Sequence, residues 1–150
     1  ARGTAAGKPN IIAERAIAVG DLRALTPAQE ANARARMHAI VAQHLPKTGA
    51  TLEFEDAYPP MAPTEGNRAL LTLLNQVNAD LGLPAMGEWD PARRGAADSS
   101  FVAADADVLA GLGAAGFGSH AEGERVDLTS IPRQALRSAA LIERLAKTPR

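Results

Sequence analysis

The sequence contains no cysteine and few aromatic residues. Without cysteine, disulfide bonds and thiolate metal sites are excluded, so a bound metal would need histidine and carboxylate ligands. The chain also lacks an excess of charge of one sign, because 16 basic residues face 17 acidic residues and the formal net charge is -1. This balance provides no cationic surface for phosphates, and we therefore expect no nucleic-acid partner.

Long apolar runs are missing as well, because charged residues, glycine or proline interrupt each run before the roughly 20 residues that cross a bilayer. We therefore expect a soluble protein with no membrane partner, and the sequence leaves the cytoplasm and the periplasm equally open. Ala1 is not methionine and no apolar signal core follows it, so we expect a processed, trimmed or split chain. With 150 residues, 46% of them hydrophobic, the chain is long enough to bury a core.

Three helices are predicted. A hydroxyl cap, an early proline and a glutamine placed for a capping box begin the first helix at Thr26, and Pro46 ends it. Thr64 caps the second helix, which Gly82 closes, and the third covers residues 129–147. The expected apolar face of the first helix comprises Ala33, Met37, Ile40, Val41 and His44. The stripe of the second comprises Leu70, Leu73, Leu74, Val77 and Leu81, and that of the third includes Ile131, Leu136, Ala139, Ala140 and Ile142 to Leu145.

Strands are predicted on both sides of the first helix. Residues 10–25 indicate two short strands or one bent strand, and residues 51–55 alternate polar and apolar side chains. Residues 107–112 are typical of a buried strand. Three prolines at positions 59, 60 and 63 favour an extended connector, so we place a domain boundary between residues 1–60 and residues 61–150.

His120 is the leading candidate for chemistry, because it ends a glycine-rich loop that follows a predicted strand. A neutral imidazole is a usual zinc ligand, but a catalytic zinc needs about three protein ligands and a water. From the loop composition alone, a solvent-exposed histidine is the favoured alternative. His38 and His44 lie six positions apart on the predicted helix, and we interpret both as structural.

Several charged residues have two interpretations. Asp21 and Arg23 share one face of a predicted strand, where the guanidinium is suited to hold a substrate carboxylate, although a surface ion pair between them is favoured by the residues alone. Asp98 is placed to cap a short helix that begins at Ser99. The carboxylates at positions 122, 124 and 127 precede the third helix and suit its N-terminal dipole. Gly116 and Gly118 do not form a dinucleotide-binding fingerprint, because no third glycine opens a helix.

The order of five segments resembles the C-terminal half of the zinc peptidases that include glutamate carboxypeptidase, peptidase T, aminoacylase and succinyl-diaminopimelate desuccinylase. The resemblance covers nearly the whole chain. Residues 10–14 and 21–23 resemble paired strands of the lid, and residues 63–67 resemble the return to the catalytic domain. Residues 95–98 and 116–120 resemble two active-site loops.

The resemblance implies an α/β fold. Residues 61–150 would be the C-terminal part of a zinc-peptidase catalytic domain, and residues 1–60 would be part of a ferredoxin-like (α+β) lid or dimerisation domain. The complete protein of this family is a hydrolase that holds two zinc ions, cleaves a peptide or N-acyl amino acid with a metal-activated water, and commonly forms a homodimer through its lid.

The resemblance also implies roles for six residues. His120 matches the last metal ligand, Asn10 and Arg23 match lid positions that bind substrate, and Asp98 with Gly116 and Gly118 belongs to loops around the site. The remaining metal ligands have no counterpart before Asn10. We therefore expect the chain alone to be inactive and a missing N-terminal segment to be its partner.

Two alternatives remain open at this point. The first is a non-catalytic binding or assembly module that retains the lid strands and the scaffold. The second is a stand-alone ferredoxin-like ligand-binding domain over residues 10–61, although its strand count is small for an independent fold.

Overall fold

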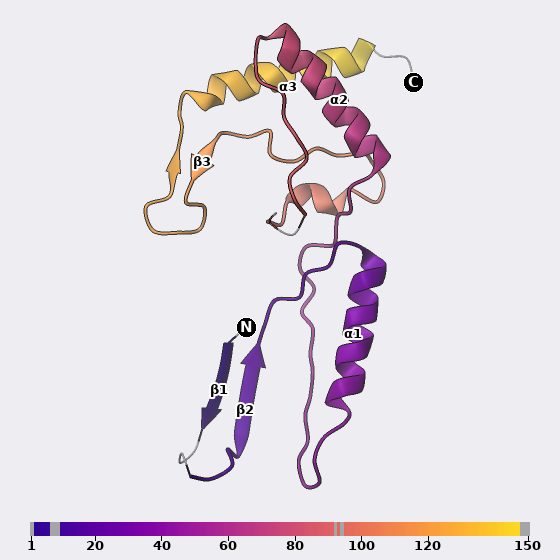
Figure 1. The fold of residues 1–150 in the computed structure, drawn as a ribbon, viewed down its shortest axis with the longest axis vertical. Coiled ribbons are helices and arrows are strands. Elements are labelled where there is room, and N and C mark those ends of the chain that lie inside the picture. Colours follow the sequence, from indigo (N-terminus) through magenta and orange to yellow (C-terminus); the bar gives the residue numbers. More distant parts are fainter. Residues whose placement is uncertain (1, 7–9, 92, 94, 148–150) are drawn as a thin grey trace. The chain divides into compact units, whose positions relative to one another are not determined.

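The computed structural model describes residues 2–6, 10–91, 93 and 95–147, and the chain divides into two units. Unit 1 comprises Ala1–Asp56 and unit 2 comprises Ala57–Arg150. The described residues form three α-helices, one short 3-10 helix and two two-stranded sheets (Figure 1). Within these residues, no helix combines the length and the apolar composition needed to cross a membrane.

The sheet of unit 1 pairs β1 (Arg2–Ala6) with β2 (Arg15–Val19) in antiparallel register, from Arg2 opposite Val19 to Ala6 opposite Arg15. The sequence correctly indicated a strand around Ile17 and Val19, but residues 10–14, which were predicted to be part of a strand, form none, and no pattern in the sequence indicated β1. Arginine, glycine and alanine dominate β1, and none of them favours a strand by itself, so this strand depends on its neighbour.

Helix α1 (Pro27–Val41) begins where the sequence predicted. The Thr26 hydroxyl accepts a 3.1 Å hydrogen bond from the backbone N–H of Gln29. The Gln29 side chain reaches back as a capping-box residue does, but it accepts the backbone N–H of Leu25, one residue before the cap. The predicted end was wrong, because the helix stops at Val41 and His44 lies beyond it.

The predicted apolar face of α1 does not form a core. No residue of α1 is buried, and Ile40 is exposed. The helix instead holds an extended neighbour through Arg34, whose guanidinium contacts the carboxylates of Glu30 at 2.5 Å and Asp56 at 2.6 Å. The same guanidinium carbon lies 4.9 Å from the centre of the Phe54 ring.

Residues 51–55 belong to no strand of the structure, so the prediction of a ladder strand here was wrong. Their alternation persists, because Leu52 and Phe54 are half-buried while Glu53 and Glu55 are exposed. The Phe54 ring packs at 5.4 Å from the ring of His38, which gives His38 the structural role that we expected. An alternating segment can therefore lie against a helix without a partner strand.

The core of unit 2 lies between α2 (Glu65–Asp80) and α3 (Ser130–Lys147). Its buried apolar residues are Leu74, Val77 and Leu141. The Thr64 hydroxyl accepts a 3.0 Å hydrogen bond from the Asn67 N–H, and Gly82 leaves the helix at a φ of +66°, so both predicted ends of α2 are confirmed.

The face that α3 turns toward α2 was not predicted. Buried positions of α3 include Arg137 and Leu141, whereas Ile142 is 66% exposed. The predicted apolar stripe of this helix lies mostly in solvent, and the exposed members are Ile131, Leu136, Ile142 and Leu145.

Residues 107–112 were predicted as a buried strand, and the structure assigns them no regular element. Their beginning is fixed against the first turn of α2. The Asp107 carboxylate lies so close to Gly66 that a Cβ atom there would be 1.8 Å from its Oδ1. The next residue, Val108, donates its backbone N–H to the Asn67 side chain at 2.8 Å.

Candidate functional site

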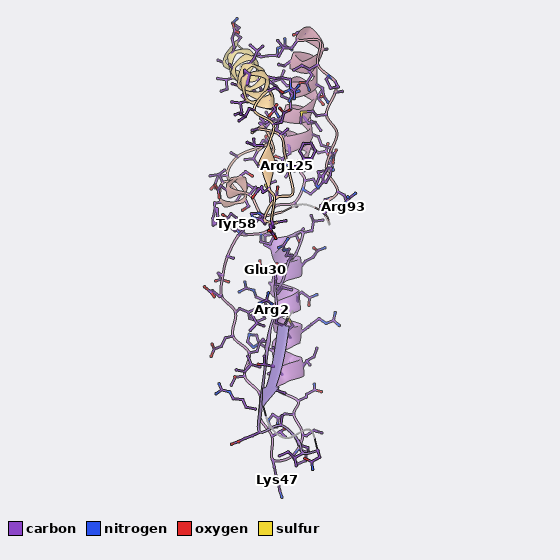
Figure 2. All side chains as sticks on the ribbon, turned by 90° about the vertical axis from the view of Figure 1, so that its left-hand side faces the viewer. Arg2, Glu30, Lys47, Tyr58, Arg93 and Arg125 are labelled. Carbon is purple, nitrogen blue, oxygen red and sulfur yellow. The ribbon has the colours of Figure 1, made fainter. Side chains whose placement is uncertain are left out.

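His120 lies in the loop of a hairpin formed by β3 (Gly116–Phe117) and β4 (Arg125–Val126). The strands are antiparallel, with Gly116 opposite Val126 and Phe117 opposite Arg125, which is labelled in Figure 2. A Cβ atom on Gly116 would lie 2.9 Å from the backbone oxygen of Arg125. Glycine is therefore required at this position for the two strands to approach each other.

Left-handed backbone turns the loop back on itself. Gly118 and Gly123 have φ angles of +72° and +82°, and His120 has a φ of +62°. The turns close through hydrogen bonds from the Ala121 N–H to the Gly118 oxygen at 3.0 Å and from the Glu124 N–H to the Ala121 oxygen at 3.2 Å. A left-handed conformation is uncommon for a residue with a side chain, so His120 occupies a strained position.

The base of the hairpin is bonded to the start of α3. Asp127 donates its N–H to the Ala115 oxygen at 2.8 Å, and Ala115 donates its N–H to the Ser130 hydroxyl oxygen at 2.8 Å. That hydroxyl donates in turn to the backbone oxygen of Asp127 at 2.6 Å. Ser130 is fully buried, so this network is a fixed connection between the hairpin and the helix.

The Asp127 carboxylate holds the next turn. Its Oδ1 accepts the Thr129 N–H at 2.9 Å and the Thr129 hydroxyl at 2.6 Å, and these bonds lower the pKa of Asp127. Sequence reasoning assigned Asp127 to the helix dipole and missed its bonds to Thr129. The signal was present in the run Asp127-Leu128-Thr129-Ser130 before Pro132, which is typical of a helix start.

The imidazole of His120 is exposed and, within the described residues, it makes no hydrogen bond. Glu122 and Glu124, in the same loop, are also exposed. No group of three or more histidine, aspartate or glutamate side chains in the described part of the chain is placed to hold a metal ion. The donor set therefore fits one terminal ligand of a zinc site and does not fit a complete site.

Asp98 begins the short helix η1 (Asp98–Phe101), and the prediction that it caps this helix was wrong. The N-cap is Ala97, which has no side-chain hydrogen bond. Asp98 instead accepts the Tyr58 hydroxyl at 3.0 Å, and the Tyr58 ring, labelled in Figure 2, lies 5.1 Å from that of Phe101. This hydrogen bond raises the pKa of Tyr58. Asp98 thus fixes the segment that enters unit 2.

Asn10 and Arg23 belong to unit 1, and both are exposed. The prediction that Arg23 and Asp21 lie on a strand was wrong, because β2 ends at Val19. The Arg23 Nε donates to the Asp21 carboxylate at 2.7 Å, and about two thirds of each side chain is exposed. Among the described residues Arg23 has no further hydrogen bond, so its two terminal nitrogens remain available to a ligand.

The structure joins none of the six predicted site residues directly to another. Gly116, Gly118 and His120 share one hairpin, and Asp98 lies in a separate segment of unit 2.

No family model matches the chain, and neither the curated proteins nor the solved structures provide a match.

Proposed function

We propose that this chain is the C-terminal part of a zinc-dependent carboxypeptidase or N-acyl amino acid amidohydrolase in which His120 is the last metal ligand. The observation that carries the proposal is the fixed position of His120. Its backbone is left-handed, with a φ of +62°, and it lies in the loop of a hairpin whose base is bonded to α3. Backbone strain of this kind persists where the surrounding structure enforces it, often at functional sites.

In this proposal the chain positions groups around a centre that a second segment completes. His120 supplies one imidazole nitrogen, and the glycines at 116 and 118 allow the backbone to bring it there. Zinc, when bound, supplies a Lewis acid and a water that is acidic enough to attack an amide carbonyl. The other ligands and the general base come from the N-terminal segment, so the chain alone is inactive.

Substrate recognition is assigned to unit 1, the proposed part of the lid. The terminal nitrogens of Arg23 are suited to a pair of hydrogen bonds with the carboxylate of a peptide or N-acyl amino acid. Asn10 offers an exposed amide for the same substrate. Asp98 acts through Tyr58, by holding the loop around residues 95–98 in place.

The proposal is tested on the protein purified from its source with any polypeptide that accompanies it. Zinc content and hydrolysis of N-acetyl amino acids and of dipeptides with a C-terminal glutamate are measured for the native protein and for His120→Ala. We expect loss of both zinc and turnover. His44→Ala is the matched control, because His44 is an exposed histidine outside the hairpin. Full zinc content and activity in His120→Ala would overturn the proposal.

A second candidate is a non-catalytic assembly module, and the exposed apolar residues of both units favour it. These include Ile11, Ile12, Ile17, Ile131 and Ile142. The same purification separates the two candidates. A stable complex that contains no zinc and hydrolyses none of these substrates supports assembly, whereas a zinc-loaded active complex supports the enzyme.

A further inference from the structure

Residues 108–112 form part of the wall of an apolar cavity of about 400 Å³ in unit 2. Helix α2 contributes Leu71 and Leu74 to the lining, and Met86 and Trp89 contribute from the segment that follows this helix. The charged side chains in the lining pair with each other, since the Arg68 Nε donates to the Glu88 carboxylate at 2.9 Å. The volume is large enough for several apolar side chains.

Part of the backbone in this wall has no hydrogen-bond partner among the described residues. Val108 donates its N–H to the Asn67 side chain, whereas the backbone groups of Leu109 and Ala110 form no hydrogen bond with any described residue. Leu109 is half-buried and packs against the core of unit 2. Unpaired backbone beside an apolar cavity has the properties of an open strand edge.

The sequence of the same segment favours a strand, as described above, and the structure shows no ladder there. The two facts agree if the partner strand is not part of this chain. A strand needs a neighbour for its hydrogen bonds, whatever the propensity of its residues. Residues 107–110 therefore have the composition of a strand and lack the neighbour.

The chain exposes more surface than a compact monomer of its mass. Its solvent-accessible surface is 12105 Å², whereas a compact monomer of this mass exposes about 7,000 Å². Two separate compact bodies with the lengths of the two units would together expose about 8,700 Å². The chain therefore exposes roughly 3,000 Å² more than two compact bodies of these lengths.

We infer that the cavity and the backbone of Leu109 and Ala110 form a docking groove for one β-strand of a second polypeptide. The strand pairs with this backbone and places alternate apolar side chains in the cavity. The identity of the second polypeptide, as the segment that carries the other zinc ligands, rests on the proposed function. The groove itself does not involve His120.

A second copy of this chain is the less suitable occupant. Its unpaired alternating segment, residues 51–55, has apolar side chains at Leu52 and Phe54, and these are already half-buried. Phe54 in particular packs against Arg34 and His38 of its own α1. Docking this segment in the groove of another copy would expose that helix face.

The groove is tested with a phage-displayed library of random 12-residue peptides selected on the immobilised chain. We expect the enriched peptides to carry valine, isoleucine or phenylalanine at alternate positions. A synthetic copy of an enriched peptide should shift the emission of Trp89 to shorter wavelength, because this is the only tryptophan, lies at the cavity and is 66% exposed. The amides of Leu109 and Ala110 should gain protection from hydrogen exchange.

Two N-methylated versions of the same peptide provide a matched control that leaves the protein unchanged. N-methylation removes a donor, and in a strand alternate residues point their N–H groups to opposite edges. Methylation along the edge that pairs with Leu109 and Ala110 should weaken binding by about tenfold or more. Methylation along the other edge should change binding little.

Three results would overturn the inference. They are the absence of enriched alternating peptides, binding without new protection at Leu109 and Ala110, and protection that rises with the concentration of the chain alone, which indicates a second copy. All measurements are repeated with a chelator and with His120→Ala. Unchanged peptide binding under these conditions keeps the groove independent of the zinc site, so either proposal can fail without the other.

Discussion

The Nε of Arg137 donates a 2.7 Å hydrogen bond to the side-chain oxygen of Asn78, and the two residues are 5% and 0% exposed. Asn78 is in turn bonded to Asn75 of the same helix at 3.0 Å. Arg137 also donates to Gln134 one turn earlier in α3. The contact between α2 and α3 therefore contains a buried guanidinium that needs hydrogen-bond acceptors from the protein.

Replacing the acceptor should cost more stability than replacing the donor. Asn78→Leu leaves the buried guanidinium without its partner on α2, and we expect a loss of about 2–4 kcal/mol. Arg137→Met removes the charge and retains the aliphatic packing, so a loss of about 1–2 kcal/mol is expected. Urea unfolding measures both, with the exposed Arg133→Met as control. Equal losses in the two variants would contradict this account.

The stability of the hairpin base should depend on acid through Asp127. Its bonds to Thr129 lower the pKa of Asp127 in the folded chain below the ordinary value of 3.8. The stabilisation is therefore complete above pH 3.8 and is lost as the pH falls through the folded value. Asp127→Asn should be less stable than the native chain near neutral pH, and the gap should close in stronger acid.

Urea unfolding at about pH 6 and at about pH 2.5 measures this gap. Asp105→Asn is the control, because the Asp105 carboxylate accepts no hydrogen bond from the described residues. A gap between Asp127→Asn and the native chain that stays constant down to the lower pH would show that ionisation of Asp127 contributes nothing.

Gly116→Ala should loosen the hairpin that carries His120. The added Cβ would lie 2.9 Å from the Arg125 backbone oxygen, so the strands must separate. We expect a cost of about 1–2 kcal/mol, seen as exchange of the Asp127 amide that is faster by about tenfold or more. Gly113→Ala is the matched control, since its new Cβ meets no atom within 4 Å. Unchanged exchange in Gly116→Ala would refute the packing argument.

His120→Gly should make the hairpin more stable while it removes the proposed metal ligand. Glycine adopts the observed φ of +62° without steric cost, whereas it loses more conformational entropy on folding than histidine does. We expect the relief of backbone strain to be the larger effect, with a net gain of about 0.5–1 kcal/mol. Thermal unfolding of the chain tests the gain, and zinc content of the native complex tests the loss. A decrease in stability would mean that His120 makes a stabilising contact.

The parts of the fold that sequence reasoning found are those encoded locally. Thr26 and Thr64 begin α1 and α2 because each hydroxyl bonds a backbone N–H three residues later, and that spacing is visible in the sequence. Gly82 ends α2 for an equally local reason, its positive φ. The glycine-rich segment before His120 was recognised from its composition, but strand β3 (Gly116–Phe117) within it was not predicted.

Most of the errors concern contacts between distant residues. The sequence favours strands at residues 51–55 and 107–112, but a ladder depends on a neighbour that no local pattern specifies. Arg137 looks like a surface residue of α3, and it is buried only because Asn78, 59 positions earlier, accepts its hydrogen bond. The role of Asp98 was missed for the same reason, since its partner Tyr58 lies 40 positions away.

The Asp107 carboxylate occupies the space that a side chain at position 66 would fill. A residue with a Cβ atom can enter the first turn of α2 there only if the Asp107 side chain moves, although most residues suit a helix better than glycine. A methyl group added at this position would displace the Asp107 carboxylate, which lies one residue before the wall of the cavity. The glycine at position 66 thus couples the start of α2 to a segment 41 positions later in the chain.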